Sequence, residues 1–434
     1  MITSKKFIVA ALALLGMGLL FGILGAMQYC IPGFLKSGFS FEKIRPLHVS
    51  SVVFWIILGA VGAVQYYLYE YFRKEIRQPF SKIQLWLFLS TIPVILISYC
   101  MGVFGGREYW EFHPLLAMPL AAGWIAFLLH YLFSIRSFRK QPVYVWMWFT
   151  GIVFFLFTFI ESYLWLIPAF RKNIIADMTV QWKSYGSMVG SWNMLIYGCS
   201  IYLMDKISES DKYSTSRIAF LIFSLGLFNL MFNWGHHIYS LPTAPYIRYV
   251  SYAVSMTELL LLGRIIYQWK ASLSTAKKYR HIVPYKFLLA ADIWIFIMLA
   301  QAILMSVPAL NLYTHGTHIT VAHTMGTTIG INTMLLMAFV YDIFSGREQP
   351  LIKARLFKTG YYGINISLFL FWSALVAAGI IRADWQMKTE RDAFGGMIQQ
   401  LLPFFIVFAI TGITLAVGFF ITFVHLRKMV KSHT

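Results

Sequence analysis

The chain has 434 residues, of which 59% are hydrophobic and 18% aromatic, while only 12% are charged. Soluble domains carry about a quarter charged residues, so this composition excludes a soluble globular protein and indicates a polytopic membrane protein. The formal net charge of +19 does not indicate a nucleic-acid-binding protein, because the basic residues lie in short loops between apolar segments, where membrane topology accounts for them.

Twelve apolar segments are long enough to cross a bilayer, which takes about 20 residues. In chain order they are 7–27, 48–72, 82–104, 114–135, 143–168, 180–204, 216–241, 245–269, 284–309, 317–344, 359–381 and 400–426. We interpret the first as a true span rather than a signal peptide, because no small-residue cleavage site follows it. No soluble domain or linker interrupts the series, so residues 1–434 are predicted to form a single all-α transmembrane domain.

Lysine and arginine gather at both termini and in every even-numbered loop except the mixed sixth. These basic residues are Lys5, Lys6, Arg73, Lys74, Arg77, Arg136, Arg139, Lys140, Lys270, Lys277, Lys278, Arg280, Arg347, Lys353, Arg355, Lys358, Arg427, Lys428 and Lys431. The positive-inside rule then predicts that both termini are cytoplasmic. We expect a multi-pass protein of a bacterial-type inner membrane.

Four histidines from three distant segments fall at one predicted depth, in the outer third of the membrane. His48 opens span 2, His236 and His237 come near the outer end of span 7, and His323 lies just inside the start of span 10. Imidazoles inside hydrocarbon are costly unless they pair or bind something, and histidine is the commonest metal ligand. Neighbouring helical residues point about 100° apart, so the adjacent pair reaches one metal only where the helix is distorted.

Four motifs carry a resemblance to a known family. They are Gly106-Arg-Glu-Tyr-Trp-Glu111, Gly235-His-His237, Ser255-Met-Thr-Glu258, and the tract from Tyr313-Thr-His-Gly-Thr to Ala322-His323. In order and spacing they resemble the catalytic subunit of the heme-copper oxidase superfamily, most closely the nitric oxide reductase branch. The resemblance covers nearly the whole chain and implies a twelve-helix, subunit I-like bundle.

The resemblance implies roles for the membrane-embedded residues. His323 would be the axial ligand of a high-spin heme b, and His48 one axial ligand of a low-spin heme b. His236 and His237 would bind a non-heme iron or copper that faces the high-spin heme. Glu258 would be the buried carboxylate near that metal, although a hydrogen-bonded structural acid is an equally good interpretation of Glu258.

The loop after span 3 carries three further residues with implied roles. Arg107, Glu108 and Glu111 match the family loop that lies beside the heme propionates, where the family has an arginine and a calcium-linked glutamate. Calcium is therefore a further expected cofactor. The alternative for Arg107 is an arginine whose guanidinium reaches the membrane surface.

Span 10 departs from the family pattern at its second ligand position. The family has His-x-His there, and this chain has His323 followed by Met325. Residues two apart on a helix point roughly 200° apart, so the two side chains can still serve two hemes. Thioether sulfur binds iron, and His/Met ligation raises the reduction potential. The alternative is that Met325 only packs and the low-spin heme is lost or otherwise ligated.

Span 6 lacks the family's third metal histidine and the glutamate that follows it. Gly186 and Gly190 stand at those positions. Met188, Asn193 or water would then complete the non-heme site, or the metal would be absent. If the family's cavity persists, restoring the pattern with Gly186→His and Gly190→Glu should raise iron occupancy and NO turnover.

The function expected from these features is reduction of a small diatomic gas, NO first, in respiratory electron transfer. Alternatives are an NO dismutase-like or O2-reducing enzyme, and a catalytically silent heme-bearing subunit for electron transfer or sensing. A secondary transporter would show broken helices in symmetric halves, and no such pair is present. The electron donor would be a cytochrome c subunit, a soluble cytochrome or a quinol. A small membrane subunit and membrane lipid are further expected partners, and nucleic acid is not.

Overall fold

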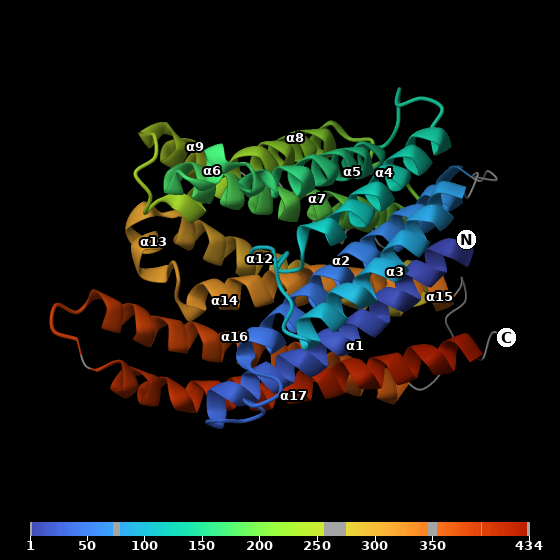
Figure 1. The fold of residues 1–434 in the computed structure, drawn as a ribbon. Coiled ribbons are helices and arrows are strands. Elements are labelled where there is room, and N and C mark those ends of the chain that lie inside the picture. The colour runs from blue at the N-terminus through green and yellow to red at the C-terminus, as the bar shows by residue number, and fades with distance from the viewer. Residues whose placement is uncertain (1, 73–78, 256–274, 346–353, 392, 432–434) are drawn as a thin grey trace. The chain divides into compact units, whose positions relative to one another are not determined.

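The computed structural model describes residues 2–72, 79–255, 275–345, 354–391 and 393–431 (Figure 1). Within these ranges the regular structure is helical, apart from one isolated β-bridge between Arg107 and Trp110. The expectation of an all-α protein is therefore confirmed.

The chain divides into two compact units. The first unit comprises Met1–Leu12 and Phe54–Tyr279, and the second comprises Ala13–Val53 and Arg280–Thr434. Helices α1 (Ile2–Cys30) and α2 (Phe41–Phe72) contribute residues to both units. The single domain over 1–434 stays a prediction.

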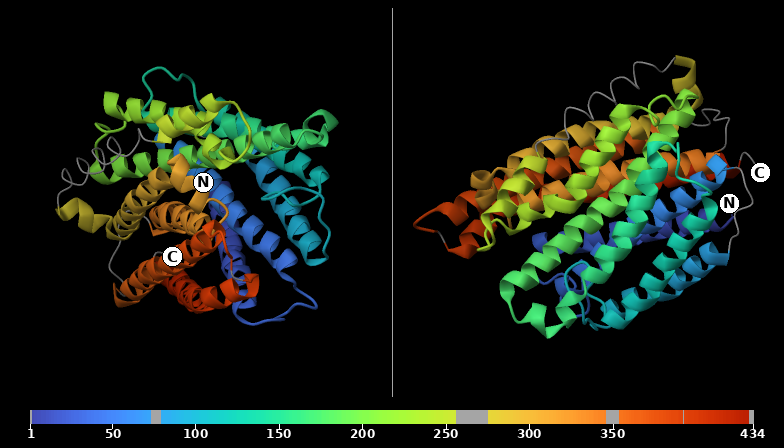
Figure 2. Two further views of the ribbon diagram at one scale, coloured as in Figure 1. Left: turned by 90° about the vertical axis from the view of Figure 1, so that its left-hand side faces the viewer. Right: turned by 90° about the horizontal axis from the view of Figure 1, so that it is seen from above.

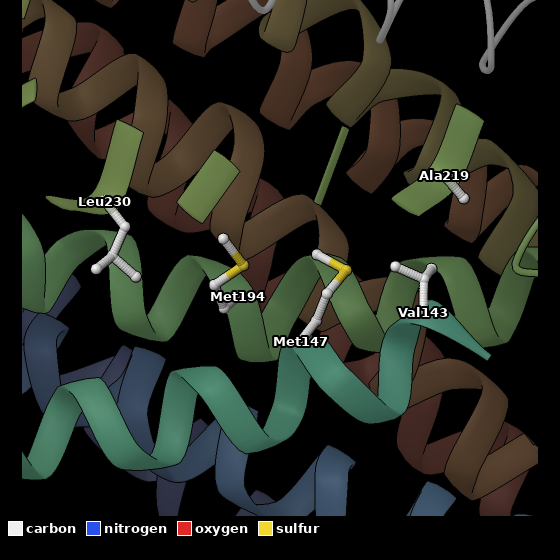
Figure 3. Close-up of a cluster of buried hydrophobic side chains, with 5 residues drawn as sticks. All are labelled: Val143, Met147, Met194, Ala219 and Leu230. Carbon is white, nitrogen blue, oxygen red and sulfur yellow. The ribbon is translucent and has the colours of Figure 1, made fainter. Parts of the chain in front are cut away.

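The remaining helices of the first unit are mostly long, with short 3-10 turns between them. They are α3 (Pro79–Cys100), η1 (Pro114–Leu116), α4 (Ala117–Ser134), α5 (Val143–Glu161), η2 (Leu164–Leu166), α6 (Pro168–Arg171), α7 (Ile174–Ser208), α8 (Arg217–Phe232), η3 (Asn233–Ile238), α9 (Pro245–Ser255) and α11 (Thr275–Arg280). Five buried apolar side chains join α5, α7 and α8 (Figure 3): Val143, Met147, Met194, Ala219 and Leu230.

The second unit adds the C-terminal helices. They are α12 (Ile282–Ser306), α13 (Pro308–Thr314), α14 (His318–Met325), η4 (Gly326–Thr333), α15 (Met334–Ser345), α16 (Ala354–Met387) and α17 (Phe394–Lys431). Helices α16 and α17 lie side by side in the views of Figures 1 and 2. A Cβ atom at Gly360 would lie 3.1 Å from the Gly418 carbonyl oxygen. Glycines therefore allow these two backbones to approach closely, as small residues do between membrane helices.

In the part of the chain that the structure describes, ten of the twelve predicted spans coincide with helices that are long and apolar enough to cross a membrane. The sixth predicted span lies in α7, which has 35 residues. Its buried face is rich in serine, and the Ser187 and Ser191 hydroxyls donate to backbone carbonyls at 2.7 Å. Only the start of the eighth predicted span lies within the described residues, as α9. The count of twelve spans and the cytoplasmic termini stay predictions.

Span 10 contains a π-helical segment that the apolar periodicity does not indicate. Residues 318–345 run as α14, the π-helix η4, and α15. A Cβ atom at Gly326 would meet the Met298 sulfur at 2.1 Å, and one at Gly330 would meet the Trp294 ring at 2.4 Å. The two glycines thus let α12 lie directly against the widened turns. Such π segments occur often at functional sites, and this one begins directly after Met325.

Candidate heme and metal sites

The imidazole of His48 is oriented by helix α1. Its Nδ1 atom lies 2.8 Å from the carbonyl oxygen of Gly18. Because a carbonyl oxygen only accepts, Nδ1 carries the proton and the lone pair is on Nε2. Metal-bound histidines are commonly fixed in this way, with the second ring nitrogen donating to a carbonyl group. The observed geometry fits a heme ligand at His48.

Two glycines on α1 make room for this imidazole. A Cβ atom at Gly22 would lie 2.9 Å from both Cε1 and Nδ1 of the His48 ring, and one at Gly18 would lie 2.8 Å from Cγ2 of Val52. Glycines one helical turn apart therefore form a groove for two side chains that are one turn apart on α2. The groove fixes the ring's position.

Replacing Gly22 with alanine is expected to displace the His48 ring, because the added methyl cannot fit beside Cε1 and Nδ1. We expect a weakened or lost low-spin heme signal in the reduced-minus-oxidised visible spectrum. Gly16→Ala is the matched control on the same helix, since a Cβ atom there meets nothing within 4 Å. Equal spectra for the two variants would remove His48 from the heme site.

His323 and Met325 lie on the regular helix α14, which ends at Met325. Their side chains are therefore about 200° apart around the helix axis, as the sequence predicts for ligands of two hemes. The Nδ1 atom of His323 is buried and has no hydrogen-bond partner among the described residues. Buried polar atoms of native proteins are rarely left unpaired. This orphaned imidazole fits a side chain whose partner is a bound group.

Sequence reasoning missed a pair of buried donors close to this helix. The Nδ1 atom of His318 and the Nε atom of Arg382 are both buried and make no hydrogen bond within the described part of the chain. The positive charge of Arg382 interacts electrostatically with the His318 side chain. The Phe405 ring lies edge-on to His318 at 5.2 Å and also contacts Tyr29 at 5.0 Å. The sequence offered one signal for His318, which is that it lies only five residues before His323.

His236 and His237 lie in the 3-10 helix η3 that continues from α8. This segment is the local distortion that an adjacent histidine pair needs to reach one metal. Their ring centroids are 4.1 Å apart with planes at 41°. The Nδ1 atom of His236 lies 3.0 Å from Oδ1 of Asn233. An amide oxygen only accepts, so the lone pair of His236 is on Nε2, the atom that would bind a metal.

Helix α7 packs closely against the histidine pair. The Trp182 ring stacks on His237 with centroids 4.7 Å apart and planes at 12°. One turn further along α7, a Cβ atom at Gly186 would lie 2.8 Å from Cβ of Trp234. Gly186, which stands at the family's third histidine position, thus lies beside η3.

The space of the missing ligands is filled by neighbouring side chains. At Gly190 a Cβ atom would meet Cγ of Leu230 at 3.0 Å, as the one at Gly186 meets Trp234. A larger side chain at either glycine therefore requires Trp234 or Leu230 to shift, and the persistence of the family's cavity stays a prediction. No group of three or more His, Cys, Asp and Glu side chains suited to a metal occurs among the residues that the structure describes. His236 and His237 are the candidate donors among the described residues, and Met188 or Asn193 as a third donor stays a prediction.

The Asn233 side chain offers a direct test of the histidine pair. Asn233→Ala removes the acceptor that fixes the His236 ring. Loss of such a supporting hydrogen bond lowers metal affinity about 10- to 100-fold in other sites. We expect a decrease of that size in iron or copper retention, measured by elemental analysis after dialysis against a chelator. Asn229→Ala on the preceding turn is the control and should retain metal as the wild type does.

The loop of the Gly-Arg-Glu-Tyr-Trp-Glu motif closes on itself. Arg107 and Trp110 exchange backbone hydrogen bonds of 3.2 and 2.8 Å, and Tyr109 has a φ of 70°. A Cβ atom at Gly106 would lie 1.9 Å from the Trp110 carbonyl oxygen, so only glycine fits there. The motif residues therefore form a tight turn, whatever ligands they also bind.

Arg107 pairs with helix α7. Its Nη1 atom lies 2.7 Å from Oδ1 of Asp177 and 3.4 Å from Oε1 of Gln181, and its guanidinium lies over the Trp165 ring. No sequence pattern indicates these partners. The roles of Arg107, Glu108 and Glu111 at heme propionates and calcium stay predictions. Glu258, the candidate carboxylate near the metal, lies outside the described residues.

Comparisons with known proteins agree with the motifs. A family model described as cytochrome c and quinol oxidase polypeptide I matches residues 3–414. A nitric oxide reductase subunit of Stutzerimonas stutzeri is 23% identical over 453 residues, covering 96% of this chain and 92% of that protein. Cytochrome c oxidase subunit 1 of Rhodobacter capsulatus is 22% identical over 430 residues, covering 92% of this chain and 80% of that protein.

Among solved structures, a heme-copper terminal oxidase shares this fold. The TM-score is 0.73 at 16% sequence identity, over 99% of this chain and 84% of that chain. The resemblance that the motifs indicate is confirmed over nearly the whole sequence.

Proposed function

The chain belongs to the cytochrome c and quinol oxidase polypeptide I family, and on that premise we propose that it is a nitric oxide reductase-like catalytic subunit. As a member of this family it is a multi-pass membrane oxidoreductase of respiratory electron transfer that carries hemes and a non-heme metal site. Two molecules of NO, two electrons and two protons give N2O and water. His323 would hold a heme and His236 and His237 a second metal, and these groups would supply the redox chemistry that the reaction needs.

The proposed cofactor ligands follow from the donor chemistry. His48 and Met325 hold a low-spin heme b, and His323 holds a high-spin heme b. Three observations support these roles: the His48 tautomer set by Gly18, the unpaired Nδ1 atom of His323, and the opposite faces of His323 and Met325. Imidazole and thioether are both common axial ligands of heme iron.

The histidine pair of η3 is the observation that most strongly supports a non-heme metal site. The rings of His236 and His237 lie side by side at 4.1 Å, and Asn233 and Trp182 hold them in place. Neutral imidazole suits both iron and copper. We propose that these two side chains bind the non-heme metal, with Glu258 as a nearby proton-carrying carboxylate.

The carboxylates of the hemes need cationic or hydrogen-bonding partners. Arg382 and His318 offer two buried donors with no partner among the described side chains, and His318 is close in sequence to His323. We propose that they bind propionates. Arg107 is a separate proposed propionate partner. Glu108 and Glu111 remain the proposed calcium ligands, since calcium takes oxygen donors.

Gas turnover tests the proposed function. The purified protein, supplied with a reduced mediator, should consume NO and release N2O under anaerobic conditions, with slower O2 consumption in the matching aerobic assay. O2 release from NO without a reductant would instead establish dismutation. Faster consumption of O2 than of NO would identify an oxidase, and either outcome overturns the proposal.

A second function, a catalytically silent heme-bearing subunit, is favoured by one observation. Glycines stand at the positions of the family's third histidine and glutamate, and they pack closely against Trp234 and Leu230. Such a subunit would bind heme and exchange electrons with a mediator, yet turn over neither NO nor O2. The same two gas assays separate it from the reductase.

The electron donor and the membrane are also proposals. We propose a bacterial inner membrane and, as donor, a cytochrome c subunit, a soluble cytochrome or a quinol. Comparing reduction rates with a c-type cytochrome and with a soluble quinol analogue distinguishes these donors. A small membrane subunit remains a proposed partner.

A further inference from the structure

A cavity of about 610 Å³ opens where two membrane helices begin. Its lining comes from the loop that precedes α5 and from the first turns of α8. Both helices are candidate membrane spans, starting at Val143 and Arg217. The cavity therefore lies at the level where a span meets the membrane surface. Its volume is in the range of small-molecule sites, about 300–1,000 Å³.

One side of the cavity is basic. Arg139 and Lys140 line it, and none of the other described residues that line it is acidic. Within the described chain, neither basic side chain forms an ion pair or a side-chain hydrogen bond. The backbone at Lys140 is left-handed, with a φ of 58°, and the Gln141 side chain donates to the Ser137 carbonyl oxygen at 3.0 Å. This turn holds two exposed cations at the cavity edge.

The other side of the cavity is apolar and firmly supported. Phe220 and Phe223 line it and also pack against the buried cluster drawn in Figure 3. Trp146 and Phe138 add a ring pair with centroids 5.1 Å apart. Tryptophan is enriched at membrane interfaces, where its ring meets both apolar and polar groups. The cavity thus joins a cationic edge to an apolar floor.

We propose that this cavity binds the headgroup of an anionic phospholipid. The phosphate would lie against Arg139 and Lys140, and the acyl chains would run along Phe220 and Phe223. Basic pockets between membrane helices bind anionic lipid headgroups in this way. A soluble anion would not contact the apolar floor. A zwitterionic lipid gains less from two cations, because its headgroup also carries a positive charge. This site is separate from the proposed heme and metal residues and does not depend on gas turnover.

Lipid binding to the delipidated full-length protein in detergent tests the proposal. Native mass spectrometry would be carried out with phosphatidylglycerol and with phosphatidylcholine. Arg139→Gln/Lys140→Gln removes both cations with little change in side-chain length. Each basic residue near a membrane surface contributes on the order of a fivefold factor, so we expect phosphatidylglycerol binding about thirtyfold weaker. Arg136→Gln/Lys212→Gln removes the same charge from exposed neighbouring positions outside the cavity and should bind as the wild type does.

Three results would overturn the proposal. They are equal phosphatidylglycerol binding by the two double variants, equal binding of the two lipids by the wild type, and displacement of phosphatidylglycerol by millimolar inorganic phosphate. The last result would identify a free anion as the ligand. The comparisons made with the wild type alone keep the proposal testable if the cavity variant fails to fold.

Discussion

Met325→Leu is expected to turn the low-spin heme high-spin. Leucine keeps the volume of the side chain but has no donor atom, so the iron would keep only His48 as a protein ligand. Met325→His should keep the heme low-spin and lower its reduction potential, because His/Met ligation holds the potential above that of two histidines. We expect a decrease on the order of 0.1 V, within the range of about 0.8 V that axial ligands span. Visible spectroscopy and a potentiometric titration measure both effects.

Met337→Leu is the control for this pair. Met337 is fully buried on α15, in the same span and after the π-helical segment. Exchanges between methionine and leucine in a core usually cost less than about 1.5 kcal/mol, so this variant should fold and keep both heme spectra. Unchanged spectra and potentials in both Met325 variants would show that Met325 only packs against its neighbours. This is the alternative that the sequence analysis left open.

Gly186→Ala is expected to destabilise the first unit. The new methyl would lie 2.8 Å from Cβ of Trp234, an atom near the backbone that cannot rotate away. Overpacking of this kind costs about 1–3 kcal/mol. Gly226→Ala on α8 is the control, because its methyl would meet only Cε of Met194, at 3.1 Å, the end of a flexible side chain. A lower thermal unfolding temperature for Gly186→Ala than for Gly226→Ala is the expected result.

The same crowding decides what histidine would do at this position. Gly186→His/Gly190→Glu places two larger side chains against Trp234 and Leu230. We expect this variant to lose stability and to gain neither iron nor NO turnover. A rise in iron content to one atom per chain, together with faster NO consumption, would contradict the tight packing of α7 against η3.

The ten candidate membrane helices of the described residues could be predicted from the sequence, because an apolar run is a local property. An apolar run of about 20 residues identifies a membrane helix wherever it occurs. The motif around His323 and the Gly-His-His tract specify ligand types at fixed spacing. The need for a distortion at His236 and His237 also followed from helix geometry alone, and η3 supplies it.

Pairings between distant segments could not be predicted in this way. Arg107 and Asp177 are 70 residues apart, and neither position shows a pattern that points to the other. The close packing at Gly186 depends on Trp234, a residue of another helix, so the sequence of span 6 alone does not indicate it. The π-helical turns after Met325 pack against α12 through Gly326 and Gly330, and the sequence of span 10 does not indicate this contact. Each of these features is set by tertiary packing rather than by local sequence.

The heme content of the purified wild-type protein tests the central claim most directly. A pyridine hemochromogen assay with protein quantified by amino-acid analysis gives hemes per chain. The account predicts two hemes b, held by His48, Met325 and His323. A chain without heme, or with a single heme, would contradict it.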